Sequence, residues 1–480
     1  MNMDTASVQF VLYGLAAVLL SNLNRSRVWR SIVLSMASLV FLALLDRNPV
    51  HFIPLAGFLV IGYVGLIFIH RGVPKATVLS ILGVIFVYIW LKKYTLLPVA
   101  LFIHSFYFTL GLSYIFFRVL HLVIEAGDAK DKPRVGVGAY LLYTLNFTTL
   151  VSGPIQRYDE FARDQFAEQP IPLGIRVIGL QLERIIRGFF KVNVLAMLLN
   201  YAREDAFIQL THPMPMSLKL YAAFRLIIIY PIFLYANFSG YIDIVIALAR
   251  LMRVRLPENF DRPFSASSFI DFWNRWHITL STWLKTYVYN PLLIALMRRF
   301  TSPAIEPVLG VFSFFVTFFL VGLWHGRTSE FITFGVLQGG GVAINKIWQL
   351  SLARALSRKG YKALAANPVY IAAGRGLTFS WFAFTLFWFW AGWAQIKTAA
   401  SSLSPVQWLE VWATVLLSAM VVLAIWESLR ALLLSISTSE GPVLTGRYAR
   451  TVYASALGFV ALVMVILLNQ PAPGLVYKAF

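Results

Sequence analysis

The stretch VLGVFSFFVTFFLVGLW, residues 308–324, decides the fold class because it contains no charged side chain. As an α-helix rising about 1.5 Å per residue, a stretch of this kind crosses most of the ~30 Å hydrocarbon core of a bilayer. Similar stretches recur along the chain, which is 59% hydrophobic and only 13% charged. Since soluble domains carry roughly 25% charged residues, the sequence predicts an all-α polytopic membrane protein.

The other apolar stretches set the expected number of membrane helices. Clear candidates are residues 10–23, 32–45, 52–69, 76–91, 97–117, 331–347, 377–393, 411–434 and 452–468, with 218–248 expected as two short or bent segments and 136–147 and 178–199 as weaker candidates. We therefore expect about 11–13 membrane helices. Because the polar stretches between them are too short to bury a core, the sequence predicts one membrane-embedded domain over residues 1–480.

The charge distribution bears on partners and topology. Lys and Arg outnumber Asp and Glu, 41 to 21, for a formal net charge of +20. The basic residues are scattered through short loops, which argues against nucleic acid as a partner and favours contact with membrane lipid. Arg25, Arg27 and Arg30 follow the first span, so the positive-inside rule places the N-terminus outside and this loop in the cytoplasm. With no cysteine, the chain has neither a thiolate metal site nor a thiol nucleophile, and we expect no metal.

The segment FWNRWHITLSTWLKTYVYNPL, residues 272–292, differs from the spans because polar residues stand among its aromatics. Pro257 and Pro263 precede it and interrupt helical hydrogen bonding, and the serines that follow are suited to N-cap a helix, namely Ser265, Ser267 and Ser268. Large apolar residues then recur at steps of three and four, which predicts one helical face: Phe269, Trp273, Trp276, Leu280, Trp283 and Tyr287.

A second, polar stripe is expected beside the aromatic one. It consists of Asn274, His277, Ser281 and Lys285, again at steps of three and four. One interpretation is an interfacial helix with Trp and Tyr at the level of the lipid head groups. The other is a re-entrant helix buried in protein, with its polar stripe lining a water-filled cavity.

His325 favours the second interpretation, because it directly follows the apolar stretch 308–324. An ionisable group at the membrane boundary is a functional candidate by default, although a histidine satisfied by a backbone carbonyl would also fit. Gly322 and Gly326, like Gly335 and Gly339, have the GxxxG spacing of tightly packed helices, which would also let a slender substrate approach the ring.

The two histidines in Trp-rich settings suggest a shared site. A neutral imidazole is the natural general base near neutral pH, able to take a proton from a hydroxyl that attacks an acyl carbonyl. Asn274 or the second imidazole would then stabilise the oxyanion by hydrogen bonding.

At this point the sequence resembles the membrane-bound O-acyltransferases. The similarity rests on FSGYIDIVIALARLMRVRLPENFDRPFSASSFIDFWNRWHITLSTWLKTYVYNPL from Phe238, GLWHG at 322–326, LGLSYIFFRVLHLV from Leu110, LVSGPIQRYDEF from Leu150 and RGFFKVNVLA from Arg187. It covers about residues 100–350, leaving 1–99 and 370–480 as peripheral spans. Within the family, it is similar to the bacterial branch of alginate O-acetyltransferases and teichoic-acid D-alanyl transfer proteins.

The resemblance implies a ring of helices around a central funnel, with re-entrant or interfacial helices. It also implies transfer of an acyl group, foremost acetyl, in the bacterial inner membrane, from a cytoplasmic thioester to a hydroxyl of an extracytoplasmic cell-envelope polysaccharide. The donor would be acetyl-CoA or an acyl carrier protein, with no tightly bound cofactor. The acceptor would be reached directly or through a periplasmic or extracellular acetyltransferase partner.

The family's invariant histidine corresponds to His325 and its second motif histidine to His277, which we expect to be the catalytic residues. The residues expected to line the substrate chamber are Asn274, Ser281, Trp276, Trp324, Tyr241 and Asp243, of which the last two could instead pack helices. One alternative is D-alanyl transfer from a carrier protein to teichoic acid. The other is a solute transporter with histidines as proton relays, although such transporters carry internal repeats that we do not find.

Overall fold

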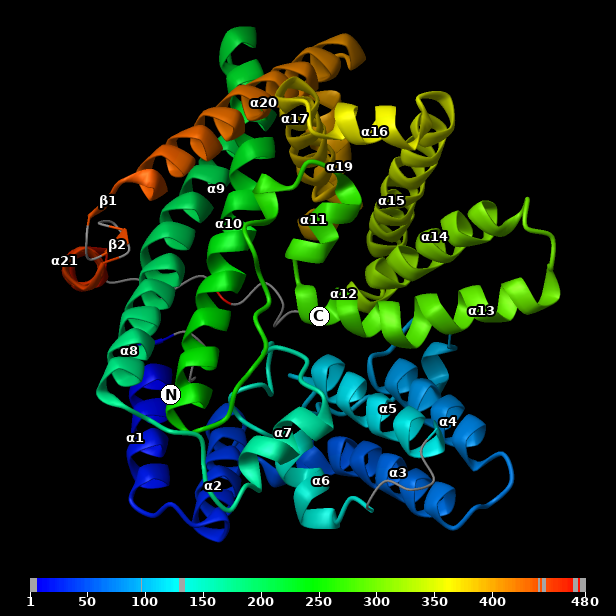
Figure 1. The fold of residues 1–480 in the computed structure, drawn as a ribbon, viewed down its shortest axis with the longest axis vertical. Helices are drawn as coiled ribbons and strands as arrows, with labels where there is room; N and C mark the ends of the chain where they lie inside the picture. Colours follow the sequence, from blue (N-terminus) through cyan, green and yellow to red (C-terminus); the bar gives the residue numbers. More distant parts are fainter. Residues whose placement is uncertain are drawn as a thin grey trace. The chain divides into compact units, whose positions relative to one another are not determined.

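The computed structural model describes residues 7–95, 97–128, 134–438, 441–442, 446–468 and 474. These residues are predominantly helical (Figure 1). The strands among them are two antiparallel two-residue segments, β1 (Ser437–Thr438) and β2 (Gly441–Pro442). The all-α class predicted from the sequence is therefore confirmed.

Seven helical stretches in the described part of the chain have the length and apolar composition of membrane spans: Arg27–Leu45, Pro49–His70, Ile175–Thr211, Met216–Leu251, Glu306–His325, Pro405–Ser435 and Arg447–Leu467. Two shorter apolar helices, α1 (Val8–Asn22) and α4 (Ala76–Leu91), accompany them. This pattern confirms a polytopic membrane protein. The long spans are fewer than the sequence count because several of the expected ones are short or interrupted helices.

The stretch 97–117 is the clearest difference from the expected spans. It contains only a short 3-10 helix, η2 (Val99–Leu101), before α5 (Leu112–Asp128) begins. The break falls at Gly111, whose φ of 77° is left-handed and whose position leaves no room for a side chain. A Cβ there would lie 2.4 Å from the Leu150 carbonyl oxygen. The expectation of one membrane helix across this stretch is wrong, because hydropathy reports apolar character and not backbone conformation.

Two other stretches also differ from expectation. Residues 218–248 do not form two segments but belong to one helix, α10 (Met216–Leu251), which continues through Pro231. Residues 377–393, expected as one span, are divided between α17 (Pro368–Thr385) and α18 (Phe387–Trp390).

The contacts between residues divide the chain into two compact units. Unit 1 comprises Met1–Val194, Asn237–Glu258 and Leu457–Phe480, and unit 2 comprises Leu195–Ala236 and Asn259–Ala456. Both α10 and α21 (Arg447–Leu468) contribute residues to each unit. The single domain expected over residues 1–480 and the ring of helices around a funnel both remain predictions.

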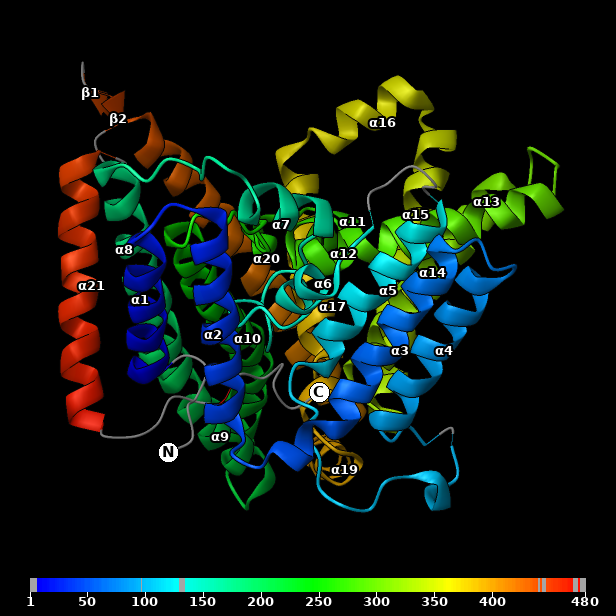
Figure 2. The same cartoon turned by 90° about the horizontal axis from the view of Figure 1, so that it is seen from below.

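Unit 1 is built from α1 to α8 and the second part of α10. Its further helices are α2 (Arg27–Leu45), η1 (Pro49–Phe52), α3 (Ile53–His70), α6 (Val137–Thr144), α7 (Tyr158–Gln165) and α8 (Ile175–Phe190). Helices α3, α4 and α5 lie side by side (Figure 2). An aromatic core joins α1 to α2, where the Phe10 and Phe41 rings lie 5.6 Å apart, and Phe147 packs 6.1 Å from Phe41.

Unit 2 carries the segments that the sequence analysis singled out for chemistry. Its helices are α9 (Met197–Thr211), the first part of α10, η4 (Pro263–Ser265), α11 (Phe269–Arg275), α12 (Ile278–Leu284), the π-helix η5 (Lys285–Tyr289), α13 (Asn290–Arg299), α14 (Glu306–His325), α15 (Ser329–Ala355), α16 (Ser357–Ala365), α17, α18, α19 (Trp393–Ser401) and α20 (Pro405–Ser435). Helices α14 and α15 are neighbours along the chain and pack against each other (Figure 1).

Candidate active site

The polypeptide breaks at His277, between α11 and α12. Trp276 is extended and His277 is left-handed, with φ 47° and ψ 51°, before α12 begins at Ile278. The expectation of one continuous amphipathic helix through this segment is therefore wrong. A non-glycine residue in this conformation stores of the order of 1–3 kcal/mol and persists only where its surroundings hold it.

Asn259 and the residue after it hold the break in place. Phe260 forms an antiparallel bridge with Trp276, and the Ile278 N–H donates to the Asn259 carbonyl at 3.0 Å. The Asn259 side-chain oxygen accepts from the backbone N–H of Thr279 at 3.0 Å and from its hydroxyl at 2.9 Å. Asn259 is fully buried. It thus acts as an N-cap supplied from a distant loop, fixing the first turn of α12 directly after His277.

The sequence analysis did not select Asn259. The available signal was its position in PENFDRP, between Pro257 and Pro263. Asparagine is a common capping residue, but the helix it caps is not the one that follows it along the chain.

The predicted aromatic face packs into the interior of unit 2. Trp276 is 1% exposed and stacks on Phe272 at 5.6 Å, and its ring lies 5.1 Å from Phe382 of α17. Ser268 caps α11 by accepting from the Asp271 N–H, as the sequence predicted. In spite of the break, burial is confirmed for five of the six predicted positions, and Tyr287 is half-buried.

The polar stripe does not form a single face. His277 is fully buried, whereas Asn274 is exposed on α11 and Lys285 is exposed at the start of η5. Ser281 is half-buried, and its hydroxyl donates to the Trp276 carbonyl at 3.4 Å. The prediction of a shared polar stripe is thus wrong, because the left-handed turn at His277 rotates the residues before it relative to those after it. Roles for Asn274 and Ser281 in substrate binding remain predictions.

His325 lies at the last turn of α14 and is 2% exposed. Its ring makes edge contacts with Phe389 of α18 at 5.0 Å and Phe334 of α15 at 5.9 Å. The His277 ring lies 6.2 Å from Trp324, the residue before His325. The Trp324 ring in turn lies 4.7 Å from that of His325. The structure therefore brings His277, Trp324 and His325 together within unit 2.

Close packing of α14 against α15 at glycines determines where His325 lies relative to α15. A Cβ at Gly322 would lie 2.3 Å from the Gly335 Cα, and a Cβ at Gly335 would lie 2.6 Å from the Phe319 carbonyl oxygen. A Cβ at Gly339 would lie 2.6 Å from the Phe315 carbonyl oxygen. The two helices thus touch backbone to backbone, as the GxxxG spacing predicted.

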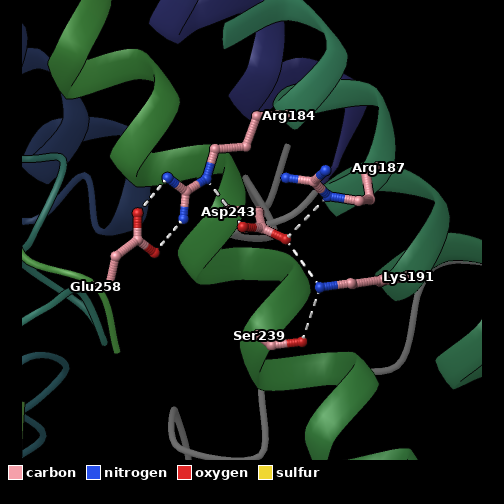
Figure 3. Close-up of polar contacts among 6 residues, drawn as sticks. All are labelled: Arg184, Arg187, Lys191, Ser239, Asp243 and Glu258. Atoms are coloured by element: carbon pink, nitrogen blue, oxygen red, sulfur yellow. Dashed lines mark hydrogen bonds and ion pairs between the residues drawn. The ribbon is translucent and has the colours of Figure 1, made fainter. Parts of the chain in front are cut away.

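The remaining predicted chamber residues, Tyr241 and Asp243, lie in unit 1 on α10. Tyr241 is fully buried, with its ring 6.1 Å from Phe10. Asp243 accepts hydrogen bonds from Arg184 and Lys191 of the preceding helical segment (Figure 3). Both residues make packing contacts within unit 1, and a role in lining a chamber remains a prediction for each. Within the described part of the chain, no group of three or more His, Cys, Asp or Glu is arranged to hold a metal ion.

Residues 106–374 match the family described as MBOAT, membrane-bound O-acyltransferase family. The chain belongs to this family. The resemblance stated from the sequence is thereby confirmed. Membership of the membrane-bound O-acyltransferases also supports the prediction that the protein is an O-acyltransferase.

Curated relatives in this family act on different acceptors. Teichoic acid D-alanyltransferase of Streptococcus thermophilus is 30% identical over 282 residues, covering 56% of this chain and 65% of the relative. Probable alginate O-acetylase of Pseudomonas fluorescens is 30% identical over 237 residues, covering 49% and 44%. Peptidoglycan O-acetyltransferase of Helicobacter pylori is 31% identical over 209 residues, covering 44% and 37%. In each case the match spans less than two thirds of the relative, and the three names support modification of the cell envelope.

Proposed function

We propose that the protein transfers an acetyl group from a cytoplasmic thioester to a hydroxyl of a cell-envelope polysaccharide. The observation that carries this proposal is the meeting of His277 and His325, two buried imidazoles from separate helices, beside Trp324 in unit 2. Membership of an O-acyltransferase family supplies the reaction class. The same membership gives the solute-transporter alternative no support.

In the proposed reaction, His325 takes the proton of the acceptor hydroxyl as its oxygen attacks the thioester carbonyl. The tetrahedral oxyanion then collapses, the carbon–sulfur bond breaks, and the proton passes from the imidazolium to the departing thiolate. General base catalysis of this kind is typically worth ~10²–10⁴ in rate. His277 assists as a hydrogen-bond donor to the oxyanion, which a preorganised and water-poor site strengthens.

The walls of the site favour acetyl over D-alanyl. The rings that contact the two imidazoles, Trp324, Phe334 and Phe389, are apolar and carry no carboxylate. A methyl group fits such walls without further partners, whereas the ammonium of a D-alanyl group loses its hydration and requires an acceptor. D-alanyl transfer from a carrier protein to teichoic acid is the second candidate, favoured by the Streptococcus thermophilus relative.

Donor and acceptor would approach from opposite faces of the bacterial inner membrane, with the N-terminus outside. Acetyl-CoA and an acyl carrier protein are both compatible donors, because the basic residues at the end of α15 and in α16, Arg354, Arg358 and Lys359, suit either. Lys130 and Lys132, two further basic residues that would suit either donor, lie outside the described residues. A periplasmic or extracellular acetyltransferase partner would relay the acetyl group if the polysaccharide does not reach the site directly.

One assay separates these candidates. Purified protein in detergent receives labelled acetyl-CoA, acetyl carrier protein or D-alanyl carrier protein together with a cell-envelope polysaccharide fraction. We expect ester label in the polysaccharide from an acetyl donor, and loss of this label in His325→Ala. His212→Ala is the matched control, because His212 is an exposed histidine of the same unit. Label only from the D-alanyl donor would replace acetyl by D-alanyl, and turnover undiminished in His325→Ala would refute the proposed base.

A further inference from the structure

Unit 1 contains a cluster of polar and charged residues where the helical segment of α8 and its continuation face α10. We call it the Asp243 cluster, and its members are Arg184, Arg187, Lys191, Ser239, Asp243 and Glu258 (Figure 3). Arg184, Arg187 and Lys191 are spaced at i, i+3 and i+7, so they share one helical face. Ser239 and Asp243 are one turn apart on α10 and face them. The segments that carry the cluster, Ile175–Thr211 and Met216–Leu251, both have the composition of membrane spans. Ionisable residues in such segments are rare and mark functional sites by default.

The two helices approach too closely for this cluster to be a loose surface feature. A Cβ at Gly188 would lie 2.5 Å from the Gly240 carbonyl oxygen, and a Cβ at Gly240 would lie 2.7 Å from that of Gly188. Directly after this contact the α-helix widens into a π-helix, η3, over Lys191–Ala196. Such single-turn widenings occur frequently at functional sites.

Two of the three cations are fully engaged by the acidic residues. Arg184 donates from Nε to Asp243 at 2.9 Å and from both terminal nitrogens to Glu258 at 2.6 Å. Lys191 donates to the other Asp243 oxygen at 2.8 Å and to the Ser239 hydroxyl at 3.2 Å. These contacts already pair two positive charges with two negative ones.

Arg187 is the most exposed of the three cations, and it is ion-paired to Asp243 without a hydrogen bond. Its Nε lies 3.8 Å from Asp243, beyond hydrogen-bonding distance, and its side chain is 47% exposed against 16% for Arg184 and 22% for Lys191. Figure 3 draws this contact as an ion pair from Nε. Of the three cations around Asp243, Arg187 therefore has the most accessible guanidinium fork.

We propose that Arg187 binds the phosphate of an anionic phospholipid head group at the edge of the Asp243 cluster. A guanidinium fork matches two phosphate oxygens bidentately, which makes arginine the preferred residue for such groups. Basic pockets between membrane helices are recognised binding sites for anionic head groups. The phosphates of a CoA donor share this chemistry, but Arg187 lies on a segment with the composition of a membrane span, which favours lipid over CoA as the ligand.

The test compares lipids on the full-length protein. Wild type, Arg187→Gln, Arg187→Lys and Arg176→Gln are purified in detergent, and the affinity for phosphatidylglycerol and phosphatidylcholine is measured by native mass spectrometry. Arg176 is the matched control, because it is an exposed arginine on the same helix. Titrations with CoA and with inorganic phosphate form separate arms. Since Arg187 makes no hydrogen bond to Asp243, Arg187→Gln is expected to fold, which its unfolding temperature without lipid verifies.

We expect Arg187→Gln to bind phosphatidylglycerol about fivefold to tenfold more weakly than wild type, with phosphatidylcholine binding unchanged. Arg187→Lys keeps the charge but loses the fork, and its affinity is expected to fall between the two. Arg176→Gln is expected to match wild type. Equal weakening in Arg176→Gln would mean general attraction to surface charge and would overturn the proposal. So would an Arg187-dependent response to CoA or inorganic phosphate without one to phosphatidylglycerol.

Discussion

Replacing Gly322 by alanine tests how His325 is positioned. The added Cβ would lie 2.3 Å from the Gly335 Cα and 2.6 Å from the Phe331 carbonyl oxygen, both of them backbone atoms. Because real Cβ contacts are essentially never shorter than 3.0 Å, α14 and α15 must separate by about 0.7 Å at this point. Overpacking of this kind is worth about 1–3 kcal/mol of lost stability. His325 lies less than one turn further along α14, and a misplacement of about 1 Å lowers catalytic rates ~10²-fold.

The assay is thermal unfolding in detergent together with the rate of acyl transfer. Gly340→Ala is the control, because Gly340 lies on α15 with no atom within 4 Å of its added Cβ. This control is expected to be neutral or stabilised by about 0.5–1 kcal/mol, since alanine favours the helix. An unchanged unfolding temperature and rate in Gly322→Ala would refute the backbone contact between the two helices.

Three further substitutions test other parts of the structure. Asp164→Asn is expected to destabilise unit 1 near neutral pH and to flatten its acid dependence. Burial raises the pKa of Asp164, but hydrogen bonds from Arg255 and its charge outweigh this and hold the pKa below its usual value. Ionised Asp164 therefore makes its full contribution to the stability of the wild type at neutral pH, and this contribution is lost as the pH falls below about 4. Asn259→Ala is expected to lose about 1–3 kcal/mol, because the Thr279 N–H and hydroxyl lose their shared buried acceptor, and to lower kcat more than it raises KM. Asp243→Asn is expected to lose about 3 kcal/mol, because the half-buried Lys191 loses its carboxylate partner and Arg184 keeps only Glu258.

Each of these predictions has a distinct contrary result. Denaturation curves with the same acid midpoint for wild type and Asp164→Asn would show that this carboxylate does not stabilise the fold. Wild-type kcat in Asn259→Ala would remove this residue from the positioning of His277. For Asp243→Asn, an unfolding temperature equal to that of the wild type would mean that the Asp243 cluster is solvated and adds little to the stability of the fold.

Periodicity in the sequence predicted which aromatic residues of α11 and α12 are buried but not the break at His277. Burial follows from local spacing, which is visible in one segment. The break depends on Asn259 and Phe260, which belong to a preceding loop and pair with Thr279 and Trp276 only after folding. The polar stripe failed for the same reason, because a helical wheel assumes that the helix continues.

The ionic contacts of unit 1 show a second limit of the sequence. Asp243 was predicted to line the chamber or to pack helices, but its partners Arg184 and Lys191 come from a different helical segment. Their pairing depends on the close approach of Gly188 to Gly240, which a single segment of sequence does not show. For the histidines, by contrast, the prediction that residues far apart in the chain converge agrees with their placement beside Trp324.

The most direct test of the central claim is a double-mutant cycle on single-turnover acyl transfer from the labelled thioester. His325→Ala is combined with His277→Gly, because glycine accepts the left-handed backbone of His277. If both imidazoles act in one transition state, His325 as the base and His277 as the oxyanion donor, His325→Ala lowers the rate ~10²–10⁴-fold. His277→Gly then lowers it far less in that background than in wild type. Independent, multiplicative losses, or a His325→Ala rate equal to wild type, would contradict a shared catalytic site.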